Sequence, residues 1–284
     1  MSKLSPALRT LINAPHARPN IIPAPSHIRS VYEDIARDAA RKNVGRPSWL
    51  ALATAATMTM NSPESLTALF EVATEQSPSS VKDKVNTAEF MREVGLKCIS
   101  FNGIPRTINL LNYFHDFLPD QILSQMTTSS SRTPTSSNIE QIRARGLALW
   151  SSIYAELDKR LLDKLAASHP DLPVHIINSH YGALLNDPPL EGRAGLGRVG
   201  RMATSIVAIA ALRAQGGVAP QVISHLFGLR KGWVDGTWKG DLQRTKGVEW
   251  LASDEGNIWV LDRVDQVVKA IRDTPSGSQP RPRL

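Results

Sequence analysis

Apolar residues recur at helical spacing through most of the chain, most clearly between Glu89 and Phe114. The first half of this stretch places four apolar side chains on one helix face, at Phe90, Val94, Cys98 and Phe101. Gly103 can end that helix because glycine adopts the left-handed conformation without strain. Pro105 suits the first turn of a following helix. The pattern predicts two apolar-faced helices joined by an Asn-Gly-x-Pro elbow.

The same periodicity, with capping and stop signals, predicts helices along the rest of the chain. We expect them from Ser26 or Ser30 to about Lys42, after Pro47, from Pro63 to Ala73, from Asn138 to about Ser168, after Asp171, from Val199 to Ala214, after Pro220, and in two short segments that close the body. The helices after Pro47 and Val199 are rich in small residues, which favours central positions. The fold class that this pattern predicts is all-α.

Two octets share the order Pro-x-x-apolar-x-x-Leu-Phe, one at Pro63–Phe70 and one at Pro220–Phe227. Each follows a helix of small apolar residues, so the body is predicted to contain two diverged copies of one helical unit. The expected parts are an N-terminal arm (1–28), repeat 1 (29–123), a Ser/Thr-rich linker (124–138), repeat 2 (139–273) and a C-terminal tail (274–284), with the repeats forming one body.

The composition is typical of a globular protein, with 42% apolar and 21% charged residues in 284. A single cysteine excludes an intrachain disulfide and a zinc site made of cysteines alone. No apolar run reaches the roughly 18 residues that a membrane span needs. The formal charge of +7 comes from scattered Lys and Arg without a nucleic-acid motif, so we expect no nucleic-acid partner.

Gly195, Gly197 and Gly200 match the spacing of a dinucleotide-binding loop. Such a loop needs a strand directly before it, and the preceding Asn-Asp-Pro-Pro stretch is no strand. We therefore interpret the glycines as a loop entering the next helix, and we predict neither a cofactor nor a metal site.

The elbow carries a resemblance to a known family. Arg92-Glu93, Phe101, Gly103-x-Pro105 and Asn109 resemble the core helix pair of the carboxymuconolactone decarboxylase/AhpD superfamily. Fungal AhpD-like members also resemble NAPHARPN near the start, SWLALATAATMTMNSP, and RVGRMATSIVAIAALRAQGG with the following SHLFGL. The resemblance implies an AhpD-like helical body that associates with itself, as a homodimer or homotrimer.

Peroxidases of the AhpD type use a Cys-x-x-Cys pair, in which one sulfur attacks and the other resolves. The chain has no second cysteine, so this chemistry is excluded. Cys98 is kept among the catalytic candidates, but its place on the apolar stripe favours a small core residue.

The resemblance to the decarboxylases points to His225, which keeps their histidine where the first copy has Ala68. The enzyme hypothesis is a cavity for a small organic acid or lactone, with acid–base chemistry of a decarboxylase or lyase at His225. Arg106 would anchor the carboxylate and Glu93 would orient it. Candidates for further substrate contacts are Asn102 and Tyr181. The alternative is a non-catalytic binding or structural protein of an oligomeric matrix assembly.

The chain ends in Pro282-Arg283-Leu284, which matches two of the three positions of a small–basic–Leu peroxisomal address. We therefore expect a peroxisomal import receptor as a partner and the peroxisome matrix as the location. The first 28 residues are basic and contain no acid, which leaves a mitochondrial presequence as the alternative.

Overall fold

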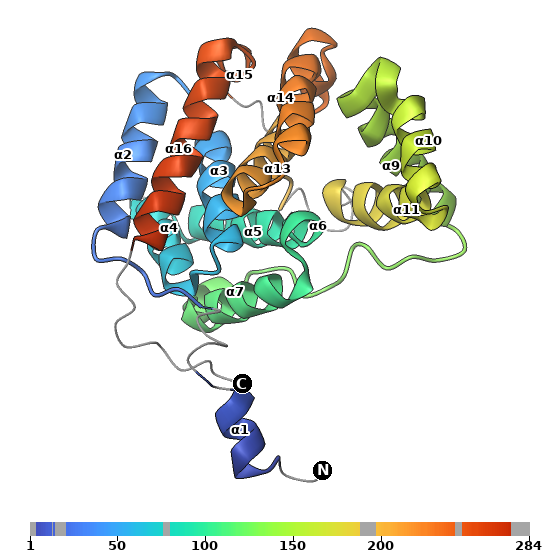
Figure 1. Cartoon of the computed structure of the whole chain (residues 1–284). Helices are drawn as coiled ribbons and strands as arrows, with labels where there is room; N and C mark the ends of the chain where they lie inside the picture. Colours follow the sequence, from blue (N-terminus) through green and yellow to red (C-terminus); the bar gives the residue numbers. More distant parts are fainter. Residues whose placement is uncertain are drawn as a thin grey trace.

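The computed structural model describes residues 4–12, 14, 21–75, 80–187, 197–241 and 246–273, and within these ranges the chain is helical without a single strand (Figure 1). The predicted all-α class is confirmed. The tail 274–284, Gly195 and most of the NAPHARPN stretch lie outside the described residues.

In chain order the elements are α1 (Pro6–Ile12), α2 (Ile28–Arg41), α3 (Arg46–Thr59), α4 (Pro63–Glu75), α5 (Val81–Lys97), α6 (Ile99–Asn102), α7 (Ile104–Phe117), α8 (Asp120–Leu123), α9 (Ile139–Tyr154), the 3-10 turn η2 (Ala155–Leu157), α10 (Asp158–Ser168), α11 (Asp171–His175), the π-helical η3 (Ile176–Leu185), α13 (Arg201–Gln215), α14 (Ala219–Val234), the 3-10 turn η4 (Thr237–Gly240), α15 (Val248–Leu251) and α16 (Asp254–Arg272).

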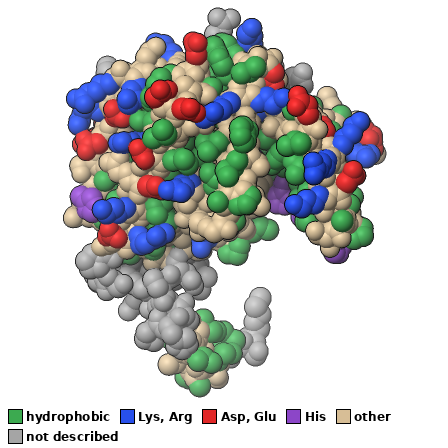
Figure 2. All heavy atoms as spheres, turned by 45° about the horizontal axis from the view of Figure 1, so that its top comes forward, with side chains coloured by type: hydrophobic (Ala, Val, Ile, Leu, Met, Phe, Trp, Pro, Cys, Tyr) green, Lys and Arg blue, Asp and Glu red, His purple; other side chains and the backbone are tan. Residues whose placement is uncertain are grey.

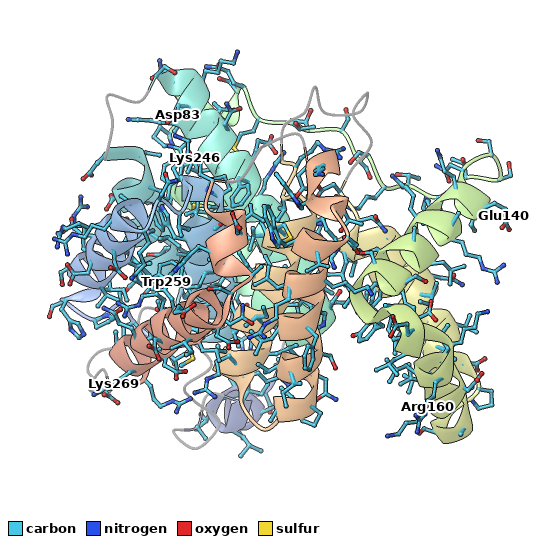
Figure 3. The ribbon with its side chains drawn as sticks, turned by 90° about the horizontal axis from the view of Figure 1, so that it is seen from above. Asp83, Glu140, Arg160, Lys246, Trp259 and Lys269 are labelled. Carbon is cyan, nitrogen blue, oxygen red and sulfur yellow. The ribbon has the colours of Figure 1, made fainter. Side chains whose placement is uncertain are left out.

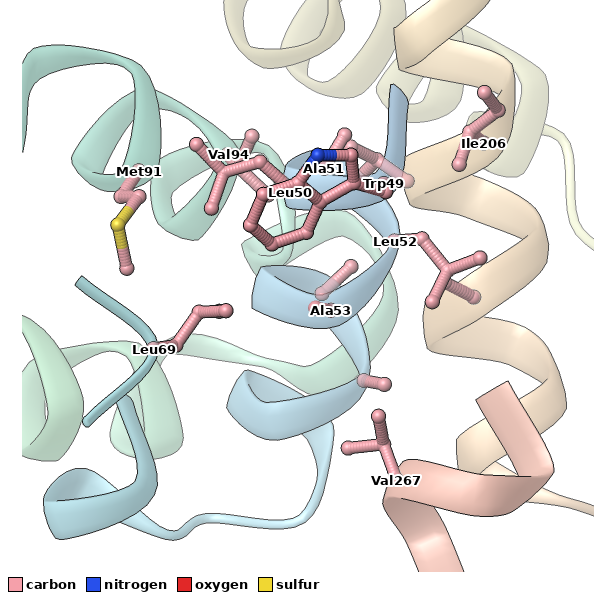
Figure 4. Packing of buried hydrophobic residues seen from close by; sticks show 14 of the residues in the cluster. Trp49, Leu50, Ala51, Leu52, Ala53, Leu69, Met91, Val94, Ile206 and Val267 are labelled. Atoms are coloured by element: carbon pink, nitrogen blue, oxygen red, sulfur yellow. The ribbon is translucent and has the colours of Figure 1, made fainter. Parts of the chain in front are cut away.

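Helices α3 and α13 lie side by side at the centre of the body. Both are built from Ala, Thr and Ser with a few larger residues, and nearly every position of each is buried. Small side chains allow two helix axes to approach closely. Figure 4 shows Leu52 of α3 directed toward α13, the helix that carries Ile206. α16 covers this pair on another side, and its Trp259 donates a 2.6 Å hydrogen bond to Asp38 of α2.

The elbow has the predicted form. Cys98 lies at the turn between α5 and α6, and α6 ends at Gly103, which adopts a left-handed φ of 78°. Pro105 then occupies the first turn of α7. The elbow therefore projects Phe101 of α6 toward the second half of the chain, where it contacts His225 of α14.

A second, smaller core joins α9 to η3 and consists of Trp150, Ile153, Ile177, Tyr181 and Leu185. The two helices cross with their backbones in contact at Gly146. A Cβ atom there would lie 2.7 Å from the carbonyl oxygen of Ile177 and 2.8 Å from the amide nitrogen of Gly182. Figure 3 shows this group, with Glu140 and Arg160, on the opposite side of the molecule from Trp259 and Lys269.

The prediction of one helix from Asn138 to about Ser168 is wrong. α9 ends at Tyr154, and Ala155 adopts a φ of 48°. The chain then turns back, because the carbonyl oxygen of Asp158 accepts from Trp150 Nε1 (3.2 Å) and its carboxylate accepts from Ser151 Oγ (2.6 Å). Local polar contacts compete here with the apolar periodicity.

The predicted repeats and domain bounds stay predictions. Their helices α3 and α13 pack together, but the two matched octets differ in burial, since Phe70 is 4% exposed and Phe227 is 64% exposed. In the segment predicted as a linker, Arg132 donates to the Ala183 carbonyl oxygen at 2.8 Å and to Glu93, and so connects the two halves. In the predicted arm, the Ile22 amide donates to the Asn61 carbonyl oxygen at 3.0 Å.

Positive and negative side chains are interspersed over the face in Figure 2. None of the helices in the described ranges combines the length and apolar character needed to cross a membrane.

Candidate functional site

The turn that enters α13 is held by the carboxylate of Asp241. Its oxygens accept from the backbone amides of Arg201 at 2.6 Å and Met202 at 3.3 Å. These amides belong to the first turn of the helix, where the backbone has no intrahelical partner. Gly200 precedes them with a φ of 86°, and a Cβ atom there would lie 2.8 Å from the Asp241 carboxylate. The glycine therefore permits both the backbone conformation and the close contact.

A second carboxylate, Asp187, accepts from the amides of Val199 at 3.1 Å and Gly200 at 2.8 Å. It also forms an ion pair with Lys97 of α5, whose Nζ lies 3.0 Å away. Burial by itself would raise the pKa of Asp187, but the Lys97 ammonium and the two amides together hold it below its ordinary value. Lys97 is fully buried, so this ion pair anchors the turn from beneath.

The Arg201 guanidinium lies buried between α9, α13 and α14. Nε donates to Ser152 Oγ and Nη1 to Ser205 Oγ, both at 2.6 Å. Nη2 donates to the carbonyl oxygens of Ser152 at 3.1 Å and Gly228 at 2.9 Å. All four acceptors are neutral oxygen atoms. Burial therefore lowers the pKa of Arg201, while the charges of Asp235 and Asp241 oppose this shift.

A cavity of about 320 Å³ opens beside this turn. Arg145, Leu149 and Ser152 line it from one face of α9, at the i, i+4 and i+7 spacing that aligns helical side chains. Arg198 faces them from the turn before α13, Arg201 from the first turn of α13, and the carboxylates of Asp187 and Asp241 from the segments that follow η3 and η4. The α9 wall thus combines an arginine with apolar side chains, and the opposite wall is polar.

His225 lies next to this region, 4% exposed, on the buried face of α14. Its ring is packed edge-on against Phe101, with centroids 6.1 Å apart, and against Tyr154 at 6.2 Å. Nδ1 is buried, and no hydrogen-bond partner for it occurs in the part of the chain that the structure describes. Burial, and then the positive charge of Arg201, lower the pKa of His225 to about 4. The imidazole is therefore neutral at neutral pH.

Tyr154 connects His225 to Tyr181, because the two tyrosine hydroxyl oxygens lie 3.1 Å apart and share a hydrogen bond. Burial raises the pKa of Tyr181 far above its ordinary range, so its hydroxyl stays protonated. Of the predicted site residues, His225 and Tyr181 therefore belong to one buried aromatic cluster.

Asn102 and Arg106 meet at a different place, the end of α3. Asn102 Oδ1 accepts from Thr59 Oγ1 at 3.1 Å, and Arg106 Nη1 donates to the Thr59 carbonyl oxygen at 2.6 Å. These two contacts attach the elbow to α3. Both residues stay predictions as substrate contacts.

Glu93 occupies a third place. Its carboxylate accepts from Arg132 Nη1 at 3.1 Å and lies 3.9 Å from Lys97 Nζ. Cys98 is completely buried, and burial raises the pKa of its thiol, which disfavours the reactive thiolate. The catalytic roles of Glu93, Cys98 and His225 stay predictions. In the structure each of the three residues has different neighbours.

The sequence analysis missed Lys97, Arg145, Asp187, Arg201 and Asp241. Its one signal for this region was the glycine spacing, which marked the turn before α13. The partners of that turn are far away in sequence, since Asp187 precedes Gly200 by 13 positions and Asp241 follows Arg201 by 40. No local pattern links such positions.

Comparison with known proteins gives one relevant similarity. The chain is 32% identical over 161 residues to Peroxisomal protein 2 of Saccharomyces cerevisiae, which covers 50% of this chain and 53% of that protein. The chain therefore spans about half the length of the curated relative it matches. No family model matches the chain, and no solved structure matches it. The AhpD-like resemblance rests on the sequence motifs alone.

Proposed function

We propose that this chain is a peroxisomal matrix protein that binds a small organic acid or lactone and does not turn it over. The similarity to Peroxisomal protein 2 carries the proposed location, and the ending Pro282-Arg283-Leu284 agrees with it. The arginine-lined cavity beside α13 supports the ligand class. Self-association as a homodimer or homotrimer belongs to the same proposal and comes from the AhpD-like resemblance.

The location is tested with a fluorescent protein fused to the N-terminus, which leaves Leu284 free. The fusion should form puncta that coincide with a peroxisomal marker. Deleting Arg283 and Leu284 should disperse it, because the import receptor reads the terminal residues. Arg281→Ala removes a nearby charge and keeps the ending, so it should leave the puncta unchanged. Puncta that survive the deletion would show that another segment carries the address, and a mitochondrial pattern in a C-terminal fusion would favour the presequence.

The surroundings of His225 support the proposal of binding without turnover. A general base works best with a pKa near the operating pH, whereas burial and Arg201 lower that of His225 to about 4. Arg106 and Glu93, the other members of the hypothetical site, bind Thr59 and Arg132 instead.

The test is saturation-transfer NMR of the purified chain with hexanoate, glutarate and γ-valerolactone. Saturation should transfer to at least one compound, while the integrals of all three stay constant over a day. Consumption of a compound would support the alternative of an acid–base enzyme. Absence of transfer to any compound would contradict the binding proposal and favour a structural matrix protein.

A further inference from the structure

The cations of the cavity outnumber its acids. Three arginines line it, Arg145, Arg198 and Arg201, against the two carboxylates Asp187 and Asp241. Asp187 is also paired with Lys97, which lies behind the wall. The carboxylates are already engaged, because both accept hydrogen bonds from backbone amides of the turn before α13 and its first residues. The cavity therefore attracts anions.

Arg145 differs from Arg201 in having an unused donor. Arg201 donates to four oxygen atoms and is fixed by them. Arg145 Nε is buried, and no acceptor for it exists among the residues that the structure describes. A buried donor without an acceptor costs free energy. Arg145 also lines the cavity, and a guanidinium in such a place is suited to a planar carboxylate, which can take two parallel hydrogen bonds from it.

The remaining wall defines the rest of the ligand. Ala148 and Leu149 of α9 and Leu185 of η3 present apolar surface to the cavity. A volume of about 320 Å³ lies at the lower end of the range of about 300–1,000 Å³ for small-molecule sites. This space fits a short apolar stem attached to one charged group.

We infer that Arg145 anchors the carboxylate of a small monocarboxylic acid, whose apolar stem packs against Ala148, Leu149 and Leu185. This inference rests on the proposed function and goes further by naming the anchor, the ligand class and its orientation. The charge of Arg201 adds long-range attraction from the opposite wall. A lactone of similar size lacks the negative charge, so it binds more weakly.

The test uses Arg145→Gln and its matched control Arg143→Gln, measured by isothermal titration calorimetry with hexanoate, hexanamide, γ-valerolactone and inorganic phosphate. Arg143 lies two residues away on α9, is exposed and does not line the cavity. Hexanoate should bind the wild type and Arg143→Gln equally. Arg145→Gln should raise its dissociation constant by about tenfold or more, because a charge-assisted contact is lost. The neutral amide and lactone should bind the wild type at least about tenfold more weakly than hexanoate.

Four other outcomes would overturn the inference, and one of them would also contradict the proposed function. Equal binding of hexanoate to Arg145→Gln and the wild type overturns the assignment of the anchor while leaving the proposed function intact. Phosphate binding as tightly as hexanoate overturns the monocarboxylate class. No binding of any probe to the wild type contradicts the proposed function and the inference together. A melting temperature lowered by Arg145→Gln but unaffected by Arg143→Gln, without ligand, means that Arg145 pairs within the chain and overturns the anchor role.

Discussion

Replacing Lys97 with methionine is expected to lower the free energy of unfolding by about 3–5 kcal/mol, the cost of removing one partner of a buried ion pair. The Lys97 ammonium is completely buried, donates to the Leu185 carbonyl oxygen and lies 3.0 Å from Asp187 Oδ1. Methionine fills a similar volume without a charge. Asp187 then keeps its two backbone amides but loses the ammonium that neutralises its mostly buried carboxylate.

The measurement is urea denaturation of the wild type, Lys97→Met, Asp187→Asn and the double variant. The double variant should recover part of the loss, because no unpaired charge then stays buried. Lys164→Met changes an exposed lysine of α10 and should alter stability by no more than about 0.5 kcal/mol. A Lys97→Met protein as stable as this control would show that the ion pair contributes nothing to the fold.

The same substitution connects stability with the candidate site. Asp187 binds the amides of Val199 and Gly200, and these residues precede the helix that carries Arg201. Lys97 therefore acts on the cavity through the position of that turn and through Leu185, whose carbonyl oxygen accepts from it. Its loss should reduce the protection of the Val199 and Gly200 amides from hydrogen exchange more than the protection of amides in α3.

Helix positions that follow from local sequence were predictable. Gly103 and Pro105 fix the elbow by their own backbone preferences, and the small residues of α3 and α13 indicated that these helices are central. Lys97 was not predictable in this way, because lysine is almost never fully buried without a partner and its partner lies 90 residues away, in the segment after η3.

The face of α14 shows a second limit of sequence patterns. In the octet Pro220–Phe227, Phe227 stands at the position that Phe70 occupies in Pro63–Phe70. In the structure, His225 is buried between Phe101 and Tyr154, while Phe227 is exposed. Helical periodicity shows which side chains share a face, but the neighbours α6 and α9 decide which face is covered.

Acidification from pH 7 to pH 5 is expected to destabilise the protein by about 2 kcal/mol through His225 alone. The folded pKa of His225 is about 4 because of burial and the charge of Arg201. The unfolded pKa is about 6.5. Between these values the unfolded state binds more protons, so stability rises with pH. The stability that the neutral His225 imidazole contributes is complete above about pH 6.5 and is lost as the pH falls toward about 4.

The groups around His225 do not offset this effect. Arg201 is positive throughout the range, and the Tyr154 and Phe101 rings are neutral. Burial and the charge of His175 also lower the pKa of His180. His180 therefore also makes the protein less stable as the pH falls. The test must therefore separate the effect of His225 on stability from the effects of the other histidines.

His225→Gln provides that separation, because glutamine is polar and does not titrate. Urea denaturation gives the free energy of unfolding at pH 7 and at pH 5. The difference between these two values should be smaller by about 2 kcal/mol in His225→Gln than in the wild type. His115→Gln replaces an exposed histidine of α7 and should keep the full wild-type difference. Since the comparison is between two pH values for each protein, any loss of packing in His225→Gln that is common to both values cancels. An unchanged pH dependence in His225→Gln would show that the imidazole is solvated or charged in the folded protein, and it would restore His225 as a candidate acid–base group.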